Sequence, residues 1–252
     1  MSKIAFITGA SSGIGAACAR KFAQGGYTLL LNARSEDKLQ ALKTELETTY
    51  GTDILLLPLD VRDRKAAAEA ITTLPERYQA IDVLVNNAGL ALGMDKEYAG
   101  VEADYDTMID TNITALLMIT RLVVPGMIAR GRGHIINIGS VAGDAAYPGG
   151  SVYCATKAAV KVLSDGLRMD LVDTPLRVTN VKPGLVETNF SVTRFGGDKE
   201  RADNVYKGIK PLTGDDIADV VYYAASAPEH VQIAEVLVLA THQASGSIVY
   251  RR

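Results

Sequence analysis

Short apolar runs alternate with longer segments of helical periodicity along almost the whole chain. The apolar runs are Lys3–Thr8, Thr28–Ala33, Ile54–Leu59, Ile81–Asn86, His134–Gly139, Arg177–Lys182 and Glu235–Leu239. Between them, helical patterns lie near residues 13–25, 35–49, 62–74, 101–130, 151–173 and 213–226. Continuous apolar strands joined by helices are typical of a parallel sheet that is covered on both faces. The pattern therefore predicts an α/β protein with a doubly wound Rossmann fold, in which these runs form a seven-stranded parallel sheet.

The segment 184–212 is the one place where this alternation is interrupted. It is long for a connection, and connections of this length are usually functional or disordered. Its apolar side chains, which argue against a disordered linker, are Phe190, Phe195, Val205 and Tyr206. No repeat or low-complexity tract divides the chain. We therefore expect residues 1–252 to form a single domain in which residues 184–212 make a partly helical lid over the functional site.

Composition and charge narrow the classes of function. The chain has 252 residues, 48% of them hydrophobic and 22% charged, and its net charge of −3 provides no basic face for nucleic acid. The richest apolar stretch, Ala115–Met127, is broken by two polar residues and a proline, so no membrane span is predicted. Because an apolar strand follows the first residues at once, we expect no signal peptide and a cytoplasmic protein.

The cysteines and histidines do not form a recognisable site. Cys18 and Cys154 have no CxxC spacing and no histidine at ligand spacing. The three histidines, His134, His230 and His242, are scattered and have no partner that suggests a catalytic triad. We expect no metal site and no disulfide, and we interpret these residues as structural.

A glycine-rich loop follows the first strand, with the sequence Thr8-Gly9-Ala10-Ser11-Ser12-Gly13-Ile14-Gly15. The first glycine allows a tight turn, and the other two allow the backbone to approach a pyrophosphate at the positive end of the next helix. The alternative is a plain turn between a strand and a helix. Its position at the start of an α/β pattern favours a dinucleotide site with contacts from Gly9, Ser11, Ser12, Gly13, Ile14 and Gly15.

The end of the second strand indicates which dinucleotide is bound. Proteins that select NAD place an acidic residue here for the ribose 2′-hydroxyl. This chain instead has Ala33 followed by Arg34 and Ser35. An arginine fork suits a 2′-phosphate, and a serine hydroxyl can support it, so we expect NADP(H) as the cofactor. The alternative is that Arg34 is a solvated charge at the start of a helix.

Two further strand ends lie where the cofactor is expected. The third strand leads into Asp60 and Val61. Asp60 either accepts a hydrogen bond from the adenine amino group or caps the following helix, and the sequence does not separate the two. The fourth strand leads into Asn87, Ala88 and Gly89, whose small size allows the chain to pass close to the cofactor ribose.

The stretch from Ser140 to Lys157 carries the candidate catalytic groups. Ser140 follows a buried strand, and Tyr153 and Lys157 are four residues apart, which places them on one face of a helix. A nearby ammonium favours the phenolate, and lowering a tyrosine pKa from about 10 to about 7 requires roughly 4 kcal/mol. This set suits proton transfer to or from an alcohol or carbonyl oxygen. An ordinary amphipathic helix is the alternative when these two residues are considered alone.

Together these motifs resemble those of the short-chain dehydrogenase/reductase family over nearly the full length of the chain. Order and spacing agree at Thr8-Gly9-x-x-x-Gly13-x-Gly15, Asn86-Asn87-Ala88-Gly89, Asn112, Ser140, Tyr153-x-x-x-Lys157 and Pro183-Gly184. The resemblance implies hydride transfer with Tyr153 as general acid/base and Ser140 on the substrate oxygen. It also implies that Lys157 binds the nicotinamide ribose and lowers the pKa of Tyr153.

The resemblance assigns two further sets of residues. Asn112 would hold a water that links Lys157 to solvent, although from the sequence alone it is equally an ordinary polar residue of the helix 101–130. The nicotinamide end of the cofactor would be lined by Pro183, Gly184, Val186 and Thr188.

A closer resemblance is to one branch of the family, the NADP-dependent 3-hydroxy acid dehydrogenases. This branch oxidises serine, L-allo-threonine and 3-hydroxyisobutyrate and reduces malonic semialdehyde. The stretches that carry the likeness are Asn87–Met94, Pro183–Ser191, Arg194-Phe195 and Ala240–Ser245. Ser35 departs from a second arginine that is common in relatives at this place, which weakens the expected selectivity for NADP.

A small hydroxy acid requires a cationic or amide partner for its carboxylate and apolar walls. Arg194 lies in the segment 184–212 next to two phenylalanines, and Met94 follows the fourth strand. We expect Arg194 to contact the carboxylate, with Met94 and Phe190 as walls. The alternative is an arginine that bonds to the backbone of the lid.

The helices at 101–130 and 151–173 keep apolar residues on more than one face. Such helices are buried, and because the sheet covers only one side, we expect a second subunit on the other. The family resemblance implies a homotetramer. Two other functions stay open: a related reductase for a 3-oxoacyl thioester or a sugar carbonyl, and a non-catalytic NADP-binding sensor.

Overall fold

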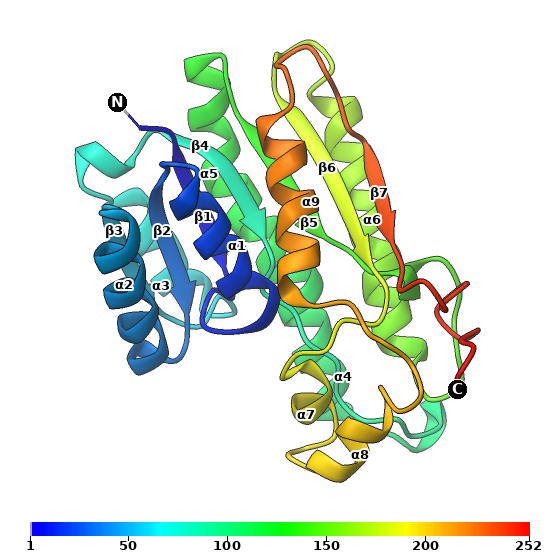
Figure 1. Ribbon diagram of the computed structural model, residues 1–252. Helices are drawn as coiled ribbons and strands as arrows, with labels where there is room; N and C mark the ends of the chain where they lie inside the picture. The colour runs from blue at the N-terminus through cyan, green and yellow to red at the C-terminus, as the bar shows by residue number, and fades with distance from the viewer. Residues whose placement is uncertain (1) are drawn as a thin grey trace.

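The computed structural model describes residues 2–252, and its centre is a parallel sheet with the strand order β3-β2-β1-β4-β5-β6-β7 (Figure 1). The strands are β1 (Ile4–Thr8), β2 (Thr28–Ala33), β3 (Ile54–Pro58), β4 (Ile81–Asn86), β5 (His134–Ile138), β6 (Arg177–Pro183) and β7 (Glu235–Val238). Each apolar run of the sequence is therefore one strand, with boundaries that differ from the predicted ones by a single residue at most. The predicted doubly wound α/β fold is confirmed.

Helices cover both faces of the sheet (Figure 1). One face is covered by α1 (Gly13–Gln24), α2 (Glu36–Tyr50) and α9 (Gly214–Ser226), and the other by α3 (Arg64–Thr72), α5 (Leu116–Arg130) and α6 (Ser151–Asp170). Short 3₁₀ turns lie at Glu76–Tyr78, Glu97–Ala99 and Val141–Gly143. Because both faces are covered, β1, β2 and β4 are buried along their whole length, whereas the edge strand β7 alternates exposed and half-buried residues.

Sequence signals at the helix ends explain several of these boundaries. The Asp63 carboxylate caps α3, and Thr213 and Asp216 form a reciprocal capping box at the start of α9. Helices α2 and α5 end at Gly51 and Gly131, which adopt φ values of 67° and 65°. Glycine reaches this left-handed conformation without the steric cost that a side chain adds.

Strands β1 and β4 lie side by side where the chain changes the direction in which it crosses the sheet. In open α/β sheets, ligands bind beyond the carboxyl ends of the strands at such a switch point. Thr8, the last residue of β1, connects the two strands. Its hydroxyl accepts hydrogen bonds from the backbone N–H groups of Asn87 (3.1 Å) and Ala88 (3.0 Å).

The predicted helix over 101–130 consists of α4 (Glu102–Ile109), a π-helical turn (Asp110–Ala115) and α5. Such π turns widen a helix locally and occur often at functional sites. Residues 102–130 are also long and apolar enough to meet a length and composition test for a membrane span, but 44% of the most apolar window is buried inside the protein. A core helix passes the same test, and Ile119 and Met127 pack in the core on one face of the sheet.

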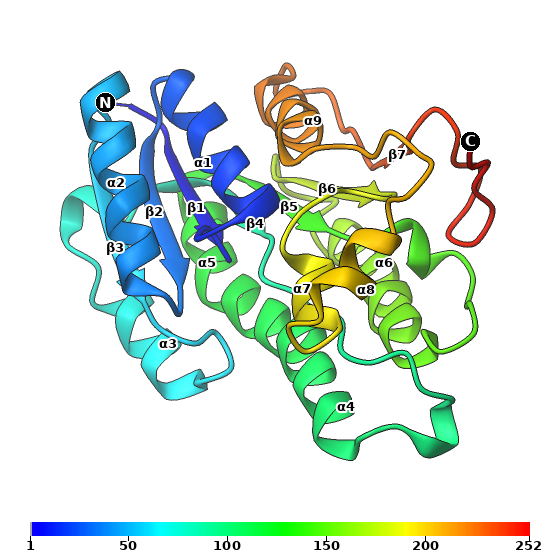
Figure 2. The same ribbon diagram turned by 60° about the horizontal axis from the view of Figure 1, so that its bottom comes forward.

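Residues 184–212 contain two short helices, α7 (Phe190–Arg194) and α8 (Lys199–Asn204). Both lie beyond the carboxyl ends of the strands (Figures 1 and 2). The C-terminal tail reaches this segment, where Arg251 Nη1 donates hydrogen bonds to the carbonyl oxygens of Val205 (3.0 Å) and Lys207 (2.6 Å). The segment is therefore partly helical and positioned over the strand ends, and its movement as a lid stays a prediction.

Candidate active site

A cleft of about 610 Å³ lies across the carboxyl ends of the strands. The expected cofactor residues that line it are Gly9, Ser11, Ser12, Gly13, Ile14, Arg34, Ser35, Asp60, Val61, Asn87, Ala88, Gly89, Pro183, Gly184, Val186 and Thr188. The expected catalytic and substrate residues in the same cleft are Ser140, Tyr153, Lys157, Met94, Phe190 and Arg194. Two expected site residues, Gly15 and Asn112, are not part of the lining.

The glycine loop leaves no room for side chains at its turn. Gly9 has φ +66°, and a Cβ there would lie 2.9 Å from the Cα of Ala88. Gly13 has φ +53°, and a Cβ there would lie 3.2 Å from the side chain of Thr188. Ser12 is the N-cap of α1 but makes no side-chain capping bond, so the first N–H groups of α1 stay available at the cleft. This arrangement suits an anionic group at the helix N-terminus.

Gly15 is closely packed at the start of α1. It is buried, and a Cβ there would lie against the carbonyl oxygen of Gly9 and 2.5 Å from Asn87 Nδ2. The structure therefore gives Gly15 a packing role, in which it lets α1 approach the end of β1. The expected approach of Gly15 to the pyrophosphate stays a prediction.

The end of the cleft near β2 and β3 carries two arginines. Arg34 and Ser35 are exposed after β2. Asp60 forms an ion pair with Arg62 (2.7 Å), and the Arg62 hydrogen bonds hold the pKa of Asp60 below its usual value. Asp63, and not Asp60, caps α3, so the capping alternative for Asp60 is wrong.

The loop after β4 connects this region with the catalytic residues. Asn87 Nδ2 donates hydrogen bonds to the carbonyl oxygens of Thr8 (2.9 Å) and Gly9 (3.1 Å). A Cβ added to Gly89 would lie 3.4 Å from Lys157 Nζ. The small residues expected here therefore allow the β4 loop to pass directly between the glycine loop and the catalytic lysine.

The structure brings Ser140, Tyr153 and Lys157 together, and all three are buried. Ser140 begins the turn after β5, and the other two lie on α6. Lys157 Nζ donates a hydrogen bond to the carbonyl oxygen of Ile138 (2.8 Å) and lies 6.0 Å from the centre of the Tyr153 ring. A proton donor or acceptor, a hydroxyl and a cation therefore meet at the bottom of the cleft.

Burial dominates the acid–base properties of both α6 residues. It raises the pKa of Tyr153 well above its usual value, against the opposing effects of a hydrogen bond with Ser140 and the charge of Arg194. Burial also lowers the pKa of Lys157 to about 8. In the protein without its cofactor, loss of water from the phenolate therefore outweighs the charge of Arg194 in setting the pKa of Tyr153. The expected lowering of this pKa by Lys157 and the bound cofactor stays a prediction.

Asn112 lies in the π turn and is almost fully buried. Its Nδ2 donates hydrogen bonds to the carbonyl oxygen of Leu90 (2.8 Å) and to the hydroxyl of Thr156 (3.0 Å), and its Oδ1 accepts one from the N–H of Leu90 (2.9 Å). Both amide hydrogens are therefore used within the protein. This geometry assigns the Asn112 side chain to joining the β4 loop and α6, and its hold on a water stays a prediction.

The strand end at Pro183 and Gly184 is fixed by the C-terminal tail. Gln243 Oε1 accepts a hydrogen bond from the N–H of Leu185 (2.8 Å), and a Cβ at Gly184 would collide with the same oxygen. Thr188 turns its hydroxyl to the N–H of Phe190 (3.2 Å) at the start of α7. These contacts set the course of the segment that leads from β6 into the lid.

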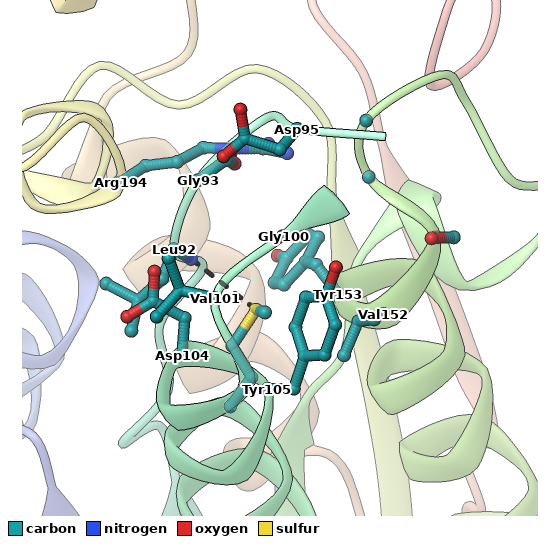
Figure 3. Close-up of a pocket in the computed structure, with 14 residues that line it drawn as sticks. Leu92, Gly93, Asp95, Gly100, Val101, Asp104, Tyr105, Val152, Tyr153 and Arg194 are labelled. Atoms are coloured by element: carbon teal, nitrogen blue, oxygen red, sulfur yellow. Dashed lines mark hydrogen bonds between the residues drawn. The ribbon is translucent and has the colours of Figure 1, made fainter. Parts of the chain in front are cut away.

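The expected substrate residues lie around Tyr153. The ring of Phe190 is 5.6 Å from the ring of Tyr153. Arg194 Nε donates to the carbonyl oxygen of Gly93 (3.1 Å) and Nη1 donates to the hydroxyl of Tyr147 (2.8 Å). Figure 3 shows Arg194 extending past Gly93 at a small neighbouring pocket that Tyr153 also lines. The arginine thus bonds to backbone, as the alternative expected, but to the β4 loop, and it still faces the cleft.

Several residues of the cleft were not expected from the sequence. Tyr147, Arg62 and Gln243 line it, and so does Thr111, whose buried hydroxyl has no hydrogen-bond partner within residues 2–252. Tyr147 could have been found from the sequence, since it is an aromatic residue in the turn-rich stretch between Ser140 and Tyr153. Gln243 lies in the stretch Ala240–Ser245, which carries part of the family likeness, but its contact with the end of β6 depends on the path of the tail.

Comparisons with known proteins agree with this geometry. The NADP-dependent 3-hydroxy acid dehydrogenase of Schizosaccharomyces pombe is 46% identical over 99% of this chain and 97% of its own length. Sulfoacetaldehyde reductase 2 of Chromohalobacter salexigens is 44% identical over 97% of this chain and 96% of its own length. The closed form of serine dehydrogenase complexed with NADP+ has a TM-score of 0.92 at 43% identity, covering 99% of both chains.

The family model described as short chain dehydrogenase matches residues 3–198, which include the glycine loop, the β4 loop and the Ser140, Tyr153 and Lys157 group. The protein therefore belongs to the short-chain dehydrogenase family.

Proposed function

We propose that the protein is an NADP-dependent oxidoreductase that interconverts small 3-hydroxy acids with their 3-oxo acids or semialdehydes. Serine, L-allo-threonine and 3-hydroxyisobutyrate represent the substrate class. The observation that carries the proposal is Arg194, which faces the cleft beside Tyr153 and makes no ion pair with an acidic residue within residues 2–252. A cation without an acidic partner next to the candidate catalytic phenol suits an anionic substrate.

The residues of the cleft fit NADP as the cofactor. The open first turn of α1 and the glycine loop suit the pyrophosphate. Arg34 and Ser35 at the end of β2 suit the 2′-phosphate, where an acidic residue would oppose it. Bound NADP supplies a hydride acceptor for the carbinol carbon, and NADPH supplies the hydride for the reverse reaction.

Side chains of the protein transfer the proton of the substrate hydroxyl and position the substrate oxygen. In oxidation, the phenolate of Tyr153 takes the proton of the substrate hydroxyl, and in reduction the phenol returns it to the carbonyl oxygen as the O–H bond of the alcohol forms. The hydroxyl of Ser140 holds the same oxygen. The ammonium of Lys157 stabilises the phenolate. Phe190 and Met94 exclude water from one side of the cleft.

The competing functions differ in the substrate that they require. A 3-oxoacyl thioester or a sugar gives Arg194 no carboxylate to bind. A non-catalytic NADP sensor does not require Ser140, Tyr153 and Lys157 to be buried together. A sulfonate is a second anion that Arg194 suits, and the similarity to a sulfoacetaldehyde reductase makes 2-hydroxyethanesulfonate the second candidate substrate.

The test is a turnover assay that follows the absorbance of reduced nicotinamide. The alcohols are L- and D-serine, L-allo-threonine, 3-hydroxyisobutyrate, 2-hydroxyethanesulfonate, a sugar alcohol and a 3-hydroxyacyl thioester, each with NADP and with NAD. We expect NADP-dependent turnover of the hydroxy acids, reduced about 100-fold or more in Tyr153→Phe. Turnover of only the thioester or the sugar alcohol would contradict the substrate class, and tight NADP binding without turnover would support a sensor.

A homotetramer and a cytoplasmic location are part of the proposal. Apolar side chains on α5 and α6 point to solvent in the single chain, including Leu117, Val162 and Met169, which are 44%, 67% and 73% exposed. A second subunit over these helices would bury them. Both cysteines are free and buried, which suits a reducing compartment. Light scattering tests the assembly, and fractionation of the cells tests the location.

A further inference from the structure

The phenol of Tyr153 lies close to two cations that come from different parts of the chain. Lys157 Nζ is 6.0 Å from the centre of the Tyr153 ring, and Arg194 Cζ is 5.8 Å from it. Lys157 lies on the same helix as Tyr153, one turn away, whereas Arg194 ends α7 in the segment 184–212. The ring of Tyr153 therefore has a second cation at nearly the same distance as the lysine.

The two cations differ in what they can still bind. Lys157 is buried and donates to the carbonyl oxygen of Ile138. Arg194 is held in place through Nε and Nη1, and within residues 2–252 its Nη2 makes no hydrogen bond. Gly93 strengthens this attachment, because its own N–H donates to the carbonyl oxygen of Arg194 (3.0 Å). Arg194 is thus fixed in position while one end of its guanidinium stays open for an anion.

Within residues 2–252, no acidic group forms an ion pair with Arg194. The other titratable groups that face Tyr153 are Tyr147 from the preceding turn and Cys154 on α6, and burial raises the pKa of both, so they are neutral near pH 7. Asp95 and Asp104 line the small pocket beside Arg194 (Figure 3), and neither is ion-paired with it. No carboxylate within residues 2–252 therefore pairs directly with Arg194, whose charge is among the influences on Tyr153.

We propose that Arg194 tunes the proton affinity of Tyr153 through its charge, and that the carboxylate of the substrate switches this effect off by binding to Arg194. The inference rests on the proposed function, since it requires an anionic substrate. Two unit charges about 6 Å apart in an effective dielectric of about 20 interact strongly enough to move a pKa by about one to two pH units. The charge of Arg194 is among the influences that lower the pKa of Tyr153.

The consequence is a site whose acid strength depends on occupancy. In the empty site Arg194 favours the phenolate. When a 3-oxo acid binds, its carboxylate cancels the cation, and Tyr153 holds its proton until transfer to the carbonyl oxygen. This dependence on occupancy favours the reduction of oxo acids near neutral pH. A neutral substrate leaves the charge of Arg194 in place and does not change the proton affinity of Tyr153 in this way.

The pH dependence of turnover tests this directly. The profile of kcat/KM reports groups of the enzyme before the substrate binds, and the profile of kcat reports the occupied site. With 3-hydroxyisobutyrate, we expect the pKa that controls kcat to exceed the one that controls kcat/KM by about one pH unit. With the methyl ester of the same acid, the two values should coincide. Coinciding values for the acid would overturn the proposal.

Two variants separate charge from structure. Arg194→Gln removes the charge, and Arg194→Lys keeps it while losing the contacts to Gly93 and Tyr147. We expect the pKa in the kcat/KM profile of the ester to rise by about one pH unit in the glutamine variant and to stay near the wild-type value in the lysine variant. If both variants shift alike, the residue acts only by holding the lid, and the proposal fails.

A second readout does not depend on turnover of any acid. Tyrosines labelled with ¹³C at Cζ report ionisation in the complex with NADP, and Tyr153→Phe assigns the resonance. We expect Tyr153 to titrate at higher pH in Arg194→Gln, and also in the wild type when propionate is added. If hydroxy acids are not turned over but these shifts occur, the proposed substrate class fails and the effect of Arg194 stands. If hydroxy acids are turned over without these shifts, the inference fails alone.

Discussion

The amide of Asn112 donates a 3.0 Å hydrogen bond to the hydroxyl of Thr156, which joins the π turn to the helix that carries Tyr153 and Lys157. Thr156 in turn donates to the carbonyl oxygen of Tyr153 (2.7 Å). Both bonds lie between buried groups. The position of the catalytic helix relative to the β4 loop therefore depends on a side-chain pair that does not itself face the cleft.

Thr156→Val is expected to weaken this link. Valine has the shape of threonine but leaves one N–H of Asn112 buried without a partner, which costs about 1–3 kcal/mol. We expect the midpoint of urea unfolding to fall accordingly and kcat to fall several-fold, because Tyr153 is less well positioned. Thr156→Ser is the matched control, since it keeps the hydroxyl. An unchanged stability in Thr156→Val would show that Asn112 finds another partner.

The sequence predicted the position of Tyr153 but not the local structure around Asn112. Strands, helices and the place of the cleft follow from apolar periodicity and from turn residues, because both faces of a parallel sheet must be covered. The grouping of Ser140, Tyr153 and Lys157 follows from one strand end and one helix face. The π turn at Asn112 does not, since no propensity distinguishes it from the α-helix on either side.

Side-chain contacts between distant segments were the part that the sequence did not determine. Arg194 was expected near a carboxylate, but its bonds to Gly93 and Tyr147 depend on how α7 docks on the β4 loop. Gly15 was expected at the pyrophosphate, and only the three-dimensional packing of α1 on Gly9 shows its place in the interior. The pKa of Tyr153 could not be predicted from the sequence either, because the burial that raises it is a property of the whole fold.

Lys157→Met is expected to raise stability while removing activity. Burial lowers the pKa of Lys157 from 10.5 to about 8, so below pH 8 the folded protein holds a buried ammonium. This costs about 3 kcal/mol at pH 7, and the cost shrinks as pH rises from about 8 towards 10.5 because the folded form then releases the proton first. The variant also loses the hydrogen bond to Ile138, which reduces the expected gain in stability by about 1 kcal/mol.

The measurement for this variant is thermal unfolding without cofactor. The remaining gain of about 2 kcal/mol corresponds to a Tm roughly 4–8 °C higher at pH 7, and the gain should vanish near pH 10. Turnover should fall about 100-fold or more. Lys161→Met, on the same helix but partly exposed and paired with Asp165, is the control and should change Tm little. A lower Tm for Lys157→Met at pH 7 would contradict the argument.

Arg34→Ala is expected to remove much of the preference for NADP. A charge-assisted contact to the 2′-phosphate is worth roughly 1.5–3 kcal/mol, so KM for NADP should rise about 10- to 100-fold while KM for NAD changes little. Lys38→Ala, on the exposed side of α2 and outside the cleft, is the control. Steady-state kinetics of both variants and of the unmodified protein, with NADP and with NAD, measure these KM values. Equal kcat/KM for NADP and NAD in the unmodified protein would refute this role.

Gly15→Ala tests the packing role that the structure gives to this glycine. A Cβ there would lie 2.5 Å from Asn87 Nδ2 and against the carbonyl oxygen of Gly9, a backbone atom that cannot rotate away. Asn87 is itself held by bonds to Thr8 and Gly9, so the added methyl group forces α1 away from β1. Overpacking of this kind lowers the free energy of unfolding by about 1–3 kcal/mol.

Gly166→Ala is the matched control for this substitution. Gly166 lies within α6, and a Cβ there meets no atom within 4 Å, so alanine adds only helix propensity. Its free energy of unfolding should therefore rise by about 0.5–1 kcal/mol, opposite in sign to Gly15→Ala. Urea unfolding of both variants measures the pair under the same conditions. A neutral Gly15→Ala would mean that α1 can shift without cost, and that the third glycine of the loop is not required for close packing.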